Sequence, residues 1–231
     1  MTINFTTDDT TATDEAGLET GARRRWLTVP AVIGVGYTLS WIAGLSIAAP
    51  SPGFRASGPE IVSALAGHGP AVAAQFALTE GLPAAGIAVV SVALAGLARR
   101  HGATAAARFA LVSGLTAAII SVLQFGLGLA VSVTSSPGTA HLAYTAVNRM
   151  DGGKMLALAV LGAAGAAMKP LPRWLRYTGV ALAVSITVSG AAYLLLLPSL
   201  TAAAGPALVL LLIFITGCGI IIGMAPAHRK S

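Results

Sequence analysis

Six apolar segments, each long enough to cross a lipid bilayer as a helix, follow one another along the chain. A helix rises about 1.5 Å per residue, so about 20 apolar residues cross a hydrocarbon core of about 30 Å. Backbone groups in lipid must be hydrogen-bonded within the protein, which favours helices over open sheets. The pattern predicts an all-α, polytopic membrane protein, a bundle of six transmembrane helices near residues 27–48, 71–98, 107–133, 149–168, 177–197 and 206–224.

The fourth segment is the least regular of the six. Its uncharged run from Met155 to Met168 is too short to cross a bilayer alone. The helix must therefore begin further upstream and include Arg149, Asp151 and Lys154. A separate short helix at the membrane interface is expected in the preceding loop, residues 134–148.

Composition and charge placement agree with a membrane protein. Hydrophobic residues make up 55% of the 231 residues and charged residues only 10%, whereas a soluble domain has about 25% charged residues. The net charge of +6 could suggest a nucleic-acid partner, but the cations flank the apolar segments and form no separate basic domain. The expected partner is therefore the lipid bilayer, with no nucleic acid.

The cations also predict the orientation. Short loops on the cytoplasmic side carry an excess of Lys and Arg. One side of the predicted bundle has only Arg55, Arg149 and Lys154. The other side has eleven cations, which places both termini of a multi-pass cell-membrane protein in the cytoplasm: Arg23, Arg24, Arg25, Arg99, Arg100, Arg108, Lys169, Arg173, Arg176, Arg229 and Lys230.

Two parts of different composition make up the chain. Residues 1–22 are polar and rich in Thr and Asp, which predicts a disordered cytoplasmic tail. Residues 23–231 form one membrane domain. Three arginines followed by Trp26 and an apolar run loosely resemble a twin-arginine export signal. Five further spans follow, so an uncleaved anchor is the favoured interpretation of the first one.

Polar residues inside the predicted spans are the candidates for function. Only Glu60, Glu80 and Asp151 are acidic beyond the tail. Glu80 lies about ten residues from the outer end of the second span, or ~13 Å deep, where an ionised carboxylate needs a partner or water. Other polar groups share the outer half of the spans, and Asp151 and Lys154 share one helical face: Gln75, Gln124, Asp151, Lys154 and Tyr193.

This asymmetry predicts a polar, hydrated pocket open to the extracytoplasmic side. Pro83 would kink the helix beside Glu80, and the carbonyl that it frees would add to the polar lining. The pocket would hold a small lipophilic or amphiphilic molecule. As an isomerase or cyclase in metabolite biosynthesis, the protein would use Glu80 and Asp151 as catalytic acids or bases. Substrate would then be bound by four of the other polar residues: Gln75, Gln124, Lys154 and Tyr193.

Two alternatives stay open, so whether the chain is an enzyme is undecided. A small-molecule permease or resistance factor would use the same pocket for transport. A structural or regulatory membrane partner would need no pocket; Glu80 would then pair with Lys154, or be protonated, and hold the bundle together.

Cofactor and metal motifs are missing from the sequence. It contains no Walker A, GxGxxG, HExxH or GxSxG pattern, so no cofactor is expected. His68 and His141 lie in separate outer loops without a carboxylate motif, which favours solvated side chains over metal ligands. Cys218, the only cysteine, excludes an intrachain disulfide.

Small residues line several predicted helix faces. Gly219 and Gly223 form a GxxxG pattern, and Gly162, Gly165 and Ala166 form a similar stripe. Such faces let helices approach closely within one chain or between chains. Packing within the chain is favoured here, with oligomer formation as the alternative.

The stretch from Leu171 to Gly179, Leu-Pro-Arg-Trp-Leu-Arg-Tyr-Thr-Gly, enters an apolar helix that runs to Tyr193. It resembles the segment between the inner loop and the fifth helix in small bacterial membrane proteins, of the actinobacterial type, in the family of domains of unknown function numbered 4386. The resemblance covers about residues 27–197. It implies a six-helix architecture and supplies no reaction and no catalytic residues.

Overall fold

The computed structural model describes residues 11–224, with side chains described from residue 29 onward except at residue 201. All the regular secondary structure of these residues is helical, without a β-strand, as predicted. Eight α-helices, one π-helical turn (η1) and one 3₁₀ turn (η2) follow in order: α1 Thr11–Ser46, α2 Gly58–Leu65, α3 Gly69–Phe76, η1 Ala77–Gly81, α4 Leu82–Arg100, α5 Thr104–Val133, α6 Pro137–Ala166, α7 Arg173–Leu194, η2 Pro198–Ala203 and α8 Ala204–Met224.

Five of the helical segments are long and apolar enough to cross a membrane. They are Val29–Ser46 within α1, Gly69–Arg100 comprising α3, η1 and α4, and the helices α5, α7 and α8. Each overlaps one of the predicted spans. The fold is therefore compatible with a multi-pass membrane protein.

The sixth predicted span falls on α6, which does not meet the same criterion. Every stretch of 18 residues within α6 contains Arg149, Asp151 and Lys154 together. The helix does include these three residues, as the sequence predicts. The separate short helix expected in residues 134–148 is absent, because α6 begins at Pro137 and continues without a break. Pro137 suits the first turn of a helix, where its missing N–H is not needed.

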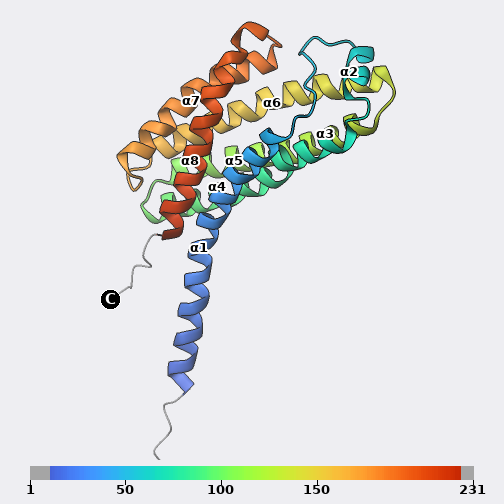
Figure 1. The fold of residues 1–231 in the computed structure, drawn as a ribbon. Helices are drawn as coiled ribbons and strands as arrows, with labels where there is room; N and C mark the ends of the chain where they lie inside the picture. Colours follow the sequence, from blue (N-terminus) through green and yellow to red (C-terminus); the bar gives the residue numbers. More distant parts are fainter. Residues whose placement is uncertain (1–10, 225–231) are drawn as a thin grey trace, which may run out of the picture.

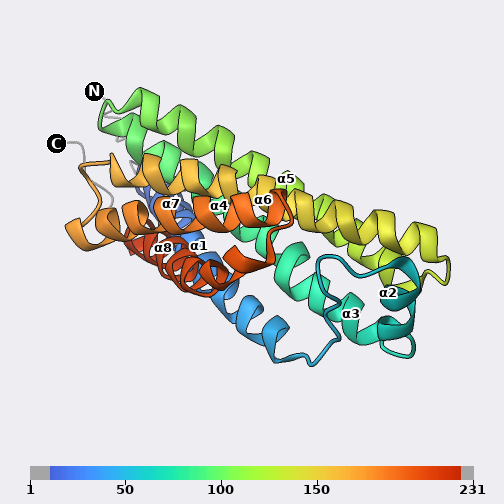
Figure 2. The same cartoon turned by 90° about the horizontal axis from the view of Figure 1, so that it is seen from above.

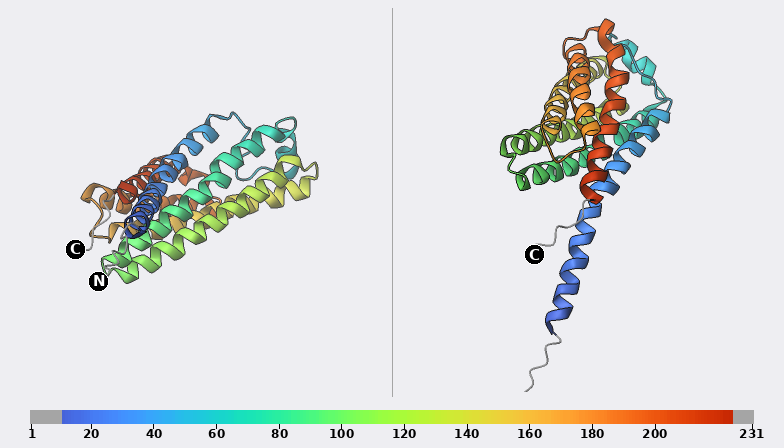
Figure 3. Two further views of the ribbon diagram at one scale, coloured as in Figure 1. Left: turned by 90° about the horizontal axis from the view of Figure 1, so that it is seen from below. Right: turned by 90° about the vertical axis from the view of Figure 1, so that its left-hand side faces the viewer.

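The chain enters the bundle through α1, whose first turns project away from the other helices (Figures 1 and 3). The helix begins at Thr11, so residues 11–22 are helical where the sequence predicts a disordered tail. An existing helix supplies the nucleus for its own extension, so added turns need no new nucleation. The remaining residues of the predicted tail, 1–10, lie outside the described part of the chain.

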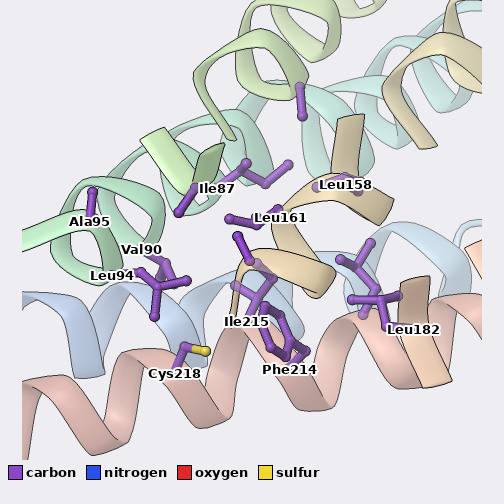
Figure 4. Packing of buried hydrophobic residues seen from close by; sticks show 14 of the residues in the cluster. Ile87, Val90, Leu94, Ala95, Leu158, Leu161, Leu182, Phe214, Ile215 and Cys218 are labelled. Carbon is purple, nitrogen blue, oxygen red and sulfur yellow. The ribbon is translucent and has the colours of Figure 1, made fainter. Parts of the chain in front are cut away.

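Most of the buried apolar side chains form one cluster, the large core, made by α1 and α4–α8. Figure 4 shows Phe214 of α8 packed near Leu158 and Leu161 of α6. In a bilayer, where lipid is as apolar as these side chains, close packing and not exclusion from water would hold such helices together. Close approach is provided by small residues: Gly162 faces the backbone of Gly179, and Gly219 faces that of Pro30.

A second cluster, the small core, lies beyond the ends of α1, α7 and α8. Here α3, α5 and α6 extend past the other helices and are joined by the short helix α2 (Figure 2). The small core contains residues from all four helices: Ile61, Leu65, Val72, Val131 and Ala140. Between the small core and the large core lie several buried polar residues: Glu80 of η1, Ser121 and Gln124 of α5, and Asn148 and Lys154 of α6.

Candidate functional site

Glu80, Asp151 and Lys154 form a buried ion-paired triad between the two cores. The Lys154 ammonium lies 2.7 and 2.8 Å from the two oxygens of Glu80 and 2.7 Å from Oδ1 of Asp151. All three N–H groups of the ammonium are therefore used. Glu80 belongs to the second predicted span and Lys154 to the fourth, so the triad ties two distant parts of the chain together.

The triad is almost closed to solvent. The side chains of Lys154 and Glu80 are 6% and 9% exposed, whereas that of Asp151 is 20% exposed. Ionised groups in such a position cost several kcal/mol unless they are paired, and each of these three is paired. Glu80 is therefore almost closed to solvent, and the carboxylate that solvent can reach is Asp151.

A π-helical turn places Glu80. The Leu82 amide donates to the carbonyl of Ala77, five residues earlier, and Pro83 follows with no N–H to donate. In this five-residue spacing the next donor, at position 83, would serve the carbonyl of Leu78, but Pro83 has no N–H. The Ser40 hydroxyl of α1 donates to the Leu78 carbonyl instead, at 2.6 Å. The carbonyl that the sequence predicts Pro83 would free is therefore satisfied by α1 and is not part of the site. Single π-helical turns are frequent at functional sites.

Gln124 of α5 joins the triad from the side. It is 1% exposed, and its amide nitrogen donates to the Val147 carbonyl at 3.1 Å and to Asp151 Oδ1 at 3.4 Å. The amide oxygen of Gln124 is buried without a hydrogen-bond partner. We call the triad together with Gln124 the polar layer.

The other two predicted binding residues differ from each other. Tyr193 of α7 lies within the electrostatic reach of Asp151 and Lys154. Its ring meets Phe54 edge to face, with ring centroids 4.8 Å apart. Gln75 of α3 is only half-buried, and its side chain makes no hydrogen bond to the polar layer. Hydrogen bonds and ion pairs thus join four of the six predicted residues, Tyr193 lies near them without such a bond, and Gln75 lies outside.

Three residues near the triad were not predicted from the sequence. Ser121 of α5 makes a side-chain hydrogen bond to Glu80. Tyr37 of α1 is buried within the electrostatic reach of the whole triad. Phe54 comes from the loop between α1 and α2. Ser121 could have been found, since it lies three residues before Gln124 on the same helical face; nothing in the sequence points to Phe54.

The loop between α1 and α2 contacts the first turns of α6 and the last turn of α7. The Tyr144 hydroxyl of α6 donates to the Pro52 carbonyl, and Phe54 contacts Tyr193 of α7. His141 bonds to the Ala56 carbonyl through Nδ1, 3.3 Å away. Among the residues that the structure describes, no three His, Cys, Asp or Glu side chains are grouped as metal ligands.

A pocket of about 140 Å³ lies where α6 ends and α7 begins. It is lined by Ala166, Arg173, Arg176, Tyr177 and Val180. Ala166 is about 18 Å further along α6 than Lys154, at 1.5 Å per residue. This pocket is therefore separate from the triad and does not correspond to the polar pocket predicted from Glu80.

Comparison with known proteins gives no relative from which a function could be transferred. No family model matches the chain, no curated protein matches it, and no solved structure matches it. The resemblance to the family numbered 4386 stays a prediction.

Proposed function

We propose that the chain is a six-span protein of the cell membrane that transports a small amphiphilic molecule through the triad. The observation that carries this proposal is the ion pair between Glu80 of η1 and Lys154 of α6. Ionisable residues inside a bundle mark substrate and ion pathways by default. An ion pair that joins two helices can open and re-form, and doing so changes how the helices pack. The membrane protein has its termini in the cytoplasm, as the eleven inner cations favour.

The direction of the helices supports six spans. A Cβ on Gly152 would lie 2.5 Å from the Leu194 amide, and one on Gly162 would lie 2.9 Å from the Gly179 carbonyl. Residue numbers therefore rise along α6 as they fall along α7, so the two helices are antiparallel neighbours through the same layer. If α7 crosses the membrane, α6 crosses it in the opposite direction.

The first and last helices support an even number of spans. Thr38 and Thr216 share a hydrogen bond of 2.7 Å, and Gly219 packs on Pro30. Hence α1 and α8 are also antiparallel, as an even number of crossings requires. Two of the three charges of α6 are no obstacle, because Lys154 pairs with Asp151 and with Glu80 inside the bundle; the third, Arg149, is exposed.

Transport is better supported than acid/base catalysis at Glu80. A general base needs a free lone pair within reach of its substrate. Both oxygens of Glu80 are bonded to Lys154, and the residue is 7% exposed. A ligand therefore reaches this group only after the ion pair has opened.

Catalysis by Asp151 is the second candidate function. Its side chain is the most exposed of the triad, at 20%, and only its Oδ1 atom is bonded to Lys154 and Gln124. The other oxygen could accept a proton from a substrate in an isomerisation or cyclisation. This reaction needs no large movement of the helices.

Substitution of the carboxylates separates these functions. Glu80→Gln and Asp151→Asn are introduced in cells that produce the protein, and small molecules are profiled inside and outside the cells. We expect an unchanged molecule in the wrong compartment; an altered molecule would support catalysis by Asp151 instead. Glu60→Gln is the matched control, because Glu60 is an exposed carboxylate on α2. Normal profiles from folded Glu80→Gln and Asp151→Asn variants would contradict both functions and leave a structural role.

A further inference from the structure

The triad has one negative charge too many when both carboxylates are ionised. Two carboxylates, Glu80 and Asp151, face a single ammonium, Lys154. Tyr37, Tyr193 and Ser121 also face the triad, and none of them carries a positive charge. Arg149, the nearest cation along α6, is exposed. A second cation or a proton is therefore needed to balance the site, since an unpaired buried charge is costly.

Gln124 provides a second and independent sign of a missing group. Its nitrogen faces two acceptors, the Val147 carbonyl and Asp151 Oδ1. The opposite orientation of the amide would bring its oxygen against both acceptors, so the hydrogen bonds fix the orientation. The oxygen is consequently the atom left buried without a donor. A buried acceptor without a partner costs about 1–3 kcal/mol, so this oxygen favours a ligand that donates a hydrogen bond.

Two aromatic rings belong to the neighbourhood of Asp151, the most exposed member of the triad. Tyr193 lies within the electrostatic reach of Asp151, and Phe54 packs edge to face on the ring of Tyr193. The faces of aromatic rings attract cations, and the rings also offer an apolar surface. A lipophilic molecule with a positive charge suits this arrangement of a carboxylate, an amide oxygen and two rings.

We propose that the ligand is a protonated amine with a lipophilic body. Its ammonium donates to Asp151 and to the free oxygen of Gln124, and its body lies against Tyr193 and Phe54. A bare metal ion is disfavoured, because hard cations take about six oxygen ligands and the polar layer has few oxygens that are not already bonded. This assignment rests on the proposed function, in which the triad is the place where the ligand binds.

Charge balance gives the exchange that accompanies binding. Without a ligand, one of the two carboxylates holds a proton as its neutral acid. When the ammonium cation enters, that carboxyl group releases its proton to the water outside, and the net charge of the site does not change. The amine keeps all its own protons, so one cation replaces another.

Calorimetry on the purified full chain in detergent micelles tests the proposal directly. The probes are 2-phenylethylammonium, the neutral 2-phenylethanol and the anionic 3-phenylpropionate, which have similar bodies and different charges. We expect the ammonium to bind at least ~10-fold more tightly than the alcohol. Titration in two buffers with different heats of ionisation should show the release of about one proton for each ammonium bound.

Two variants and a fourth probe assign the contacts. Asp151→Asn should abolish the preference for the ammonium over the alcohol. Gln124→Met should weaken 2-phenylethylammonium by ~5- to 10-fold, in the range expected for one hydrogen bond. It should leave 2-phenylethyltrimethylammonium unchanged, because that cation has no N–H to donate. The unmodified chain already tests the charge preference, so the proposal does not depend on either variant folding.

The outcomes distinguish the ligand class from the binding site. Equal or tighter binding of the alcohol or the propionate, lost in Asp151→Asn, would overturn the amine and keep the triad as the site. Binding of the ammonium without proton release would overturn the exchange. Failure of all three probes to bind the folded chain would contradict the proposed function itself, and with it the amine.

Discussion

The polar layer and the large core are neighbours on the same helices and are built on opposite principles. In the large core, α6 meets α7 and α8 through glycines, and Leu158, Leu161 and Phe214 fill the space between the helices. One turn earlier on α6, Lys154 joins η1 to α6 through charge. The first region depends on shape alone, and the second on a few strong, directional contacts.

This difference has a physical cause. Apolar side chains gain little from leaving lipid for a protein interior, so only close packing distinguishes the right neighbour from the wrong one. A charged pair has one acceptable arrangement, because any other leaves an ionised group unpaired in a medium that solvates it poorly. The large core therefore gives a stable frame, and in the proposed function the polar layer is the place where a competing ion opens that frame.

The largest effect is expected when the cation of the triad is removed, which tests whether the polar layer depends on charge. Lys154→Met leaves Glu80 and Asp151 buried side by side without their shared partner. We expect a loss of about 3–5 kcal/mol in the free energy of unfolding, the usual cost of breaking a buried ion pair. Unfolding of the purified chain in mixed micelles with rising SDS content measures this change.

A matched pair of variants shows whether charge is the cause. Lys169→Met removes an exposed cation and should have little effect. The triple variant Glu80→Gln, Asp151→Asn, Lys154→Met removes both signs of charge and should recover most of the lost stability. A triple variant as unstable as Lys154→Met would mean that Lys154 acts through its shape, and the contrast with the large core would disappear.

The second test changes the contact between α6 and α7 beside the triad. Two adjacent glycines of α6 have different surroundings there. A Cβ on Gly152 would lie 2.5 Å from the Leu194 amide and 2.7 Å from the Gly190 carbonyl. A Cβ on Gly153 would meet nothing within 4 Å. Gly152→Ala should therefore destabilise the protein by about 1–3 kcal/mol, as overpacking does.

Gly153→Ala is the control, one residue along the same helix. It should be neutral or stabilising by up to about 1 kcal/mol, because alanine is the better helix former. The same SDS titration compares the two variants. Equal effects would show that the backbones of α6 and α7 are not held at the distance that the structure gives.

Much of this comparison could be predicted from the sequence. Apolar length locates five of the long helical segments, because crossing lipid demands about 20 residues whatever the tertiary structure. The charges of α6 were expected inside the bundle, because the run from Met155 to Met168 is too short by itself. Glu80 and Lys154 were possible partners, since few other charged groups lie in the spans.

The remaining features of the site depend on which faces of the helices contact one another, and the periodicity of apolar residues does not determine those contacts. Nothing in the residue pattern distinguishes the π-helical turn at Ala77–Gly81 from a kink caused by Pro83. The contact of Phe54 with Tyr193 depends on the path of a loop with no regular structure. Tyr37 reaches the triad only because α1 packs on α4 at Gly86.

The third test sharpens the account of the π-helical turn. Ser40→Ala removes the donor to the Leu78 carbonyl, and we expect a loss of about 0.6 kcal/mol, an average value for hydrogen bonds between membrane helices. In a Pro83→Ala background the new backbone N–H can serve the freed carbonyls, so the same substitution should cost less. The difference between the two backgrounds measures the coupling of Ser40 to Pro83. An identical cost in both would show that the proline does not create the need for Ser40.

The smallest effect is expected in a test that compares the small core with the large core and does not involve the polar layer. The small core, unlike the large one, depends on the helix α2, whose first turn is capped by Glu60: its carboxylate accepts from the Ser57 amide at 2.7 Å and from the Ser57 hydroxyl at 2.9 Å. These hydrogen bonds, the backbone one first, hold the pKa of Glu60 below its usual range.

A carboxyl group whose pKa is lower in the folded state stabilises that state above its unfolded pKa, and the contribution is lost as the pH falls through the folded value. Hydrogen exchange of the α2 amides should therefore speed up relative to that of α8 when the pH is lowered through the range in which Glu60 becomes protonated, after correction for the intrinsic pH dependence of exchange. Glu60→Gln can still accept from Ser57 but carries no charge, so it should exchange at a ratio that does not change over that range. If the wild-type ratio is equally constant, the cap does not hold α2, and Ile61 and Leu65 alone fix the helix on the small core.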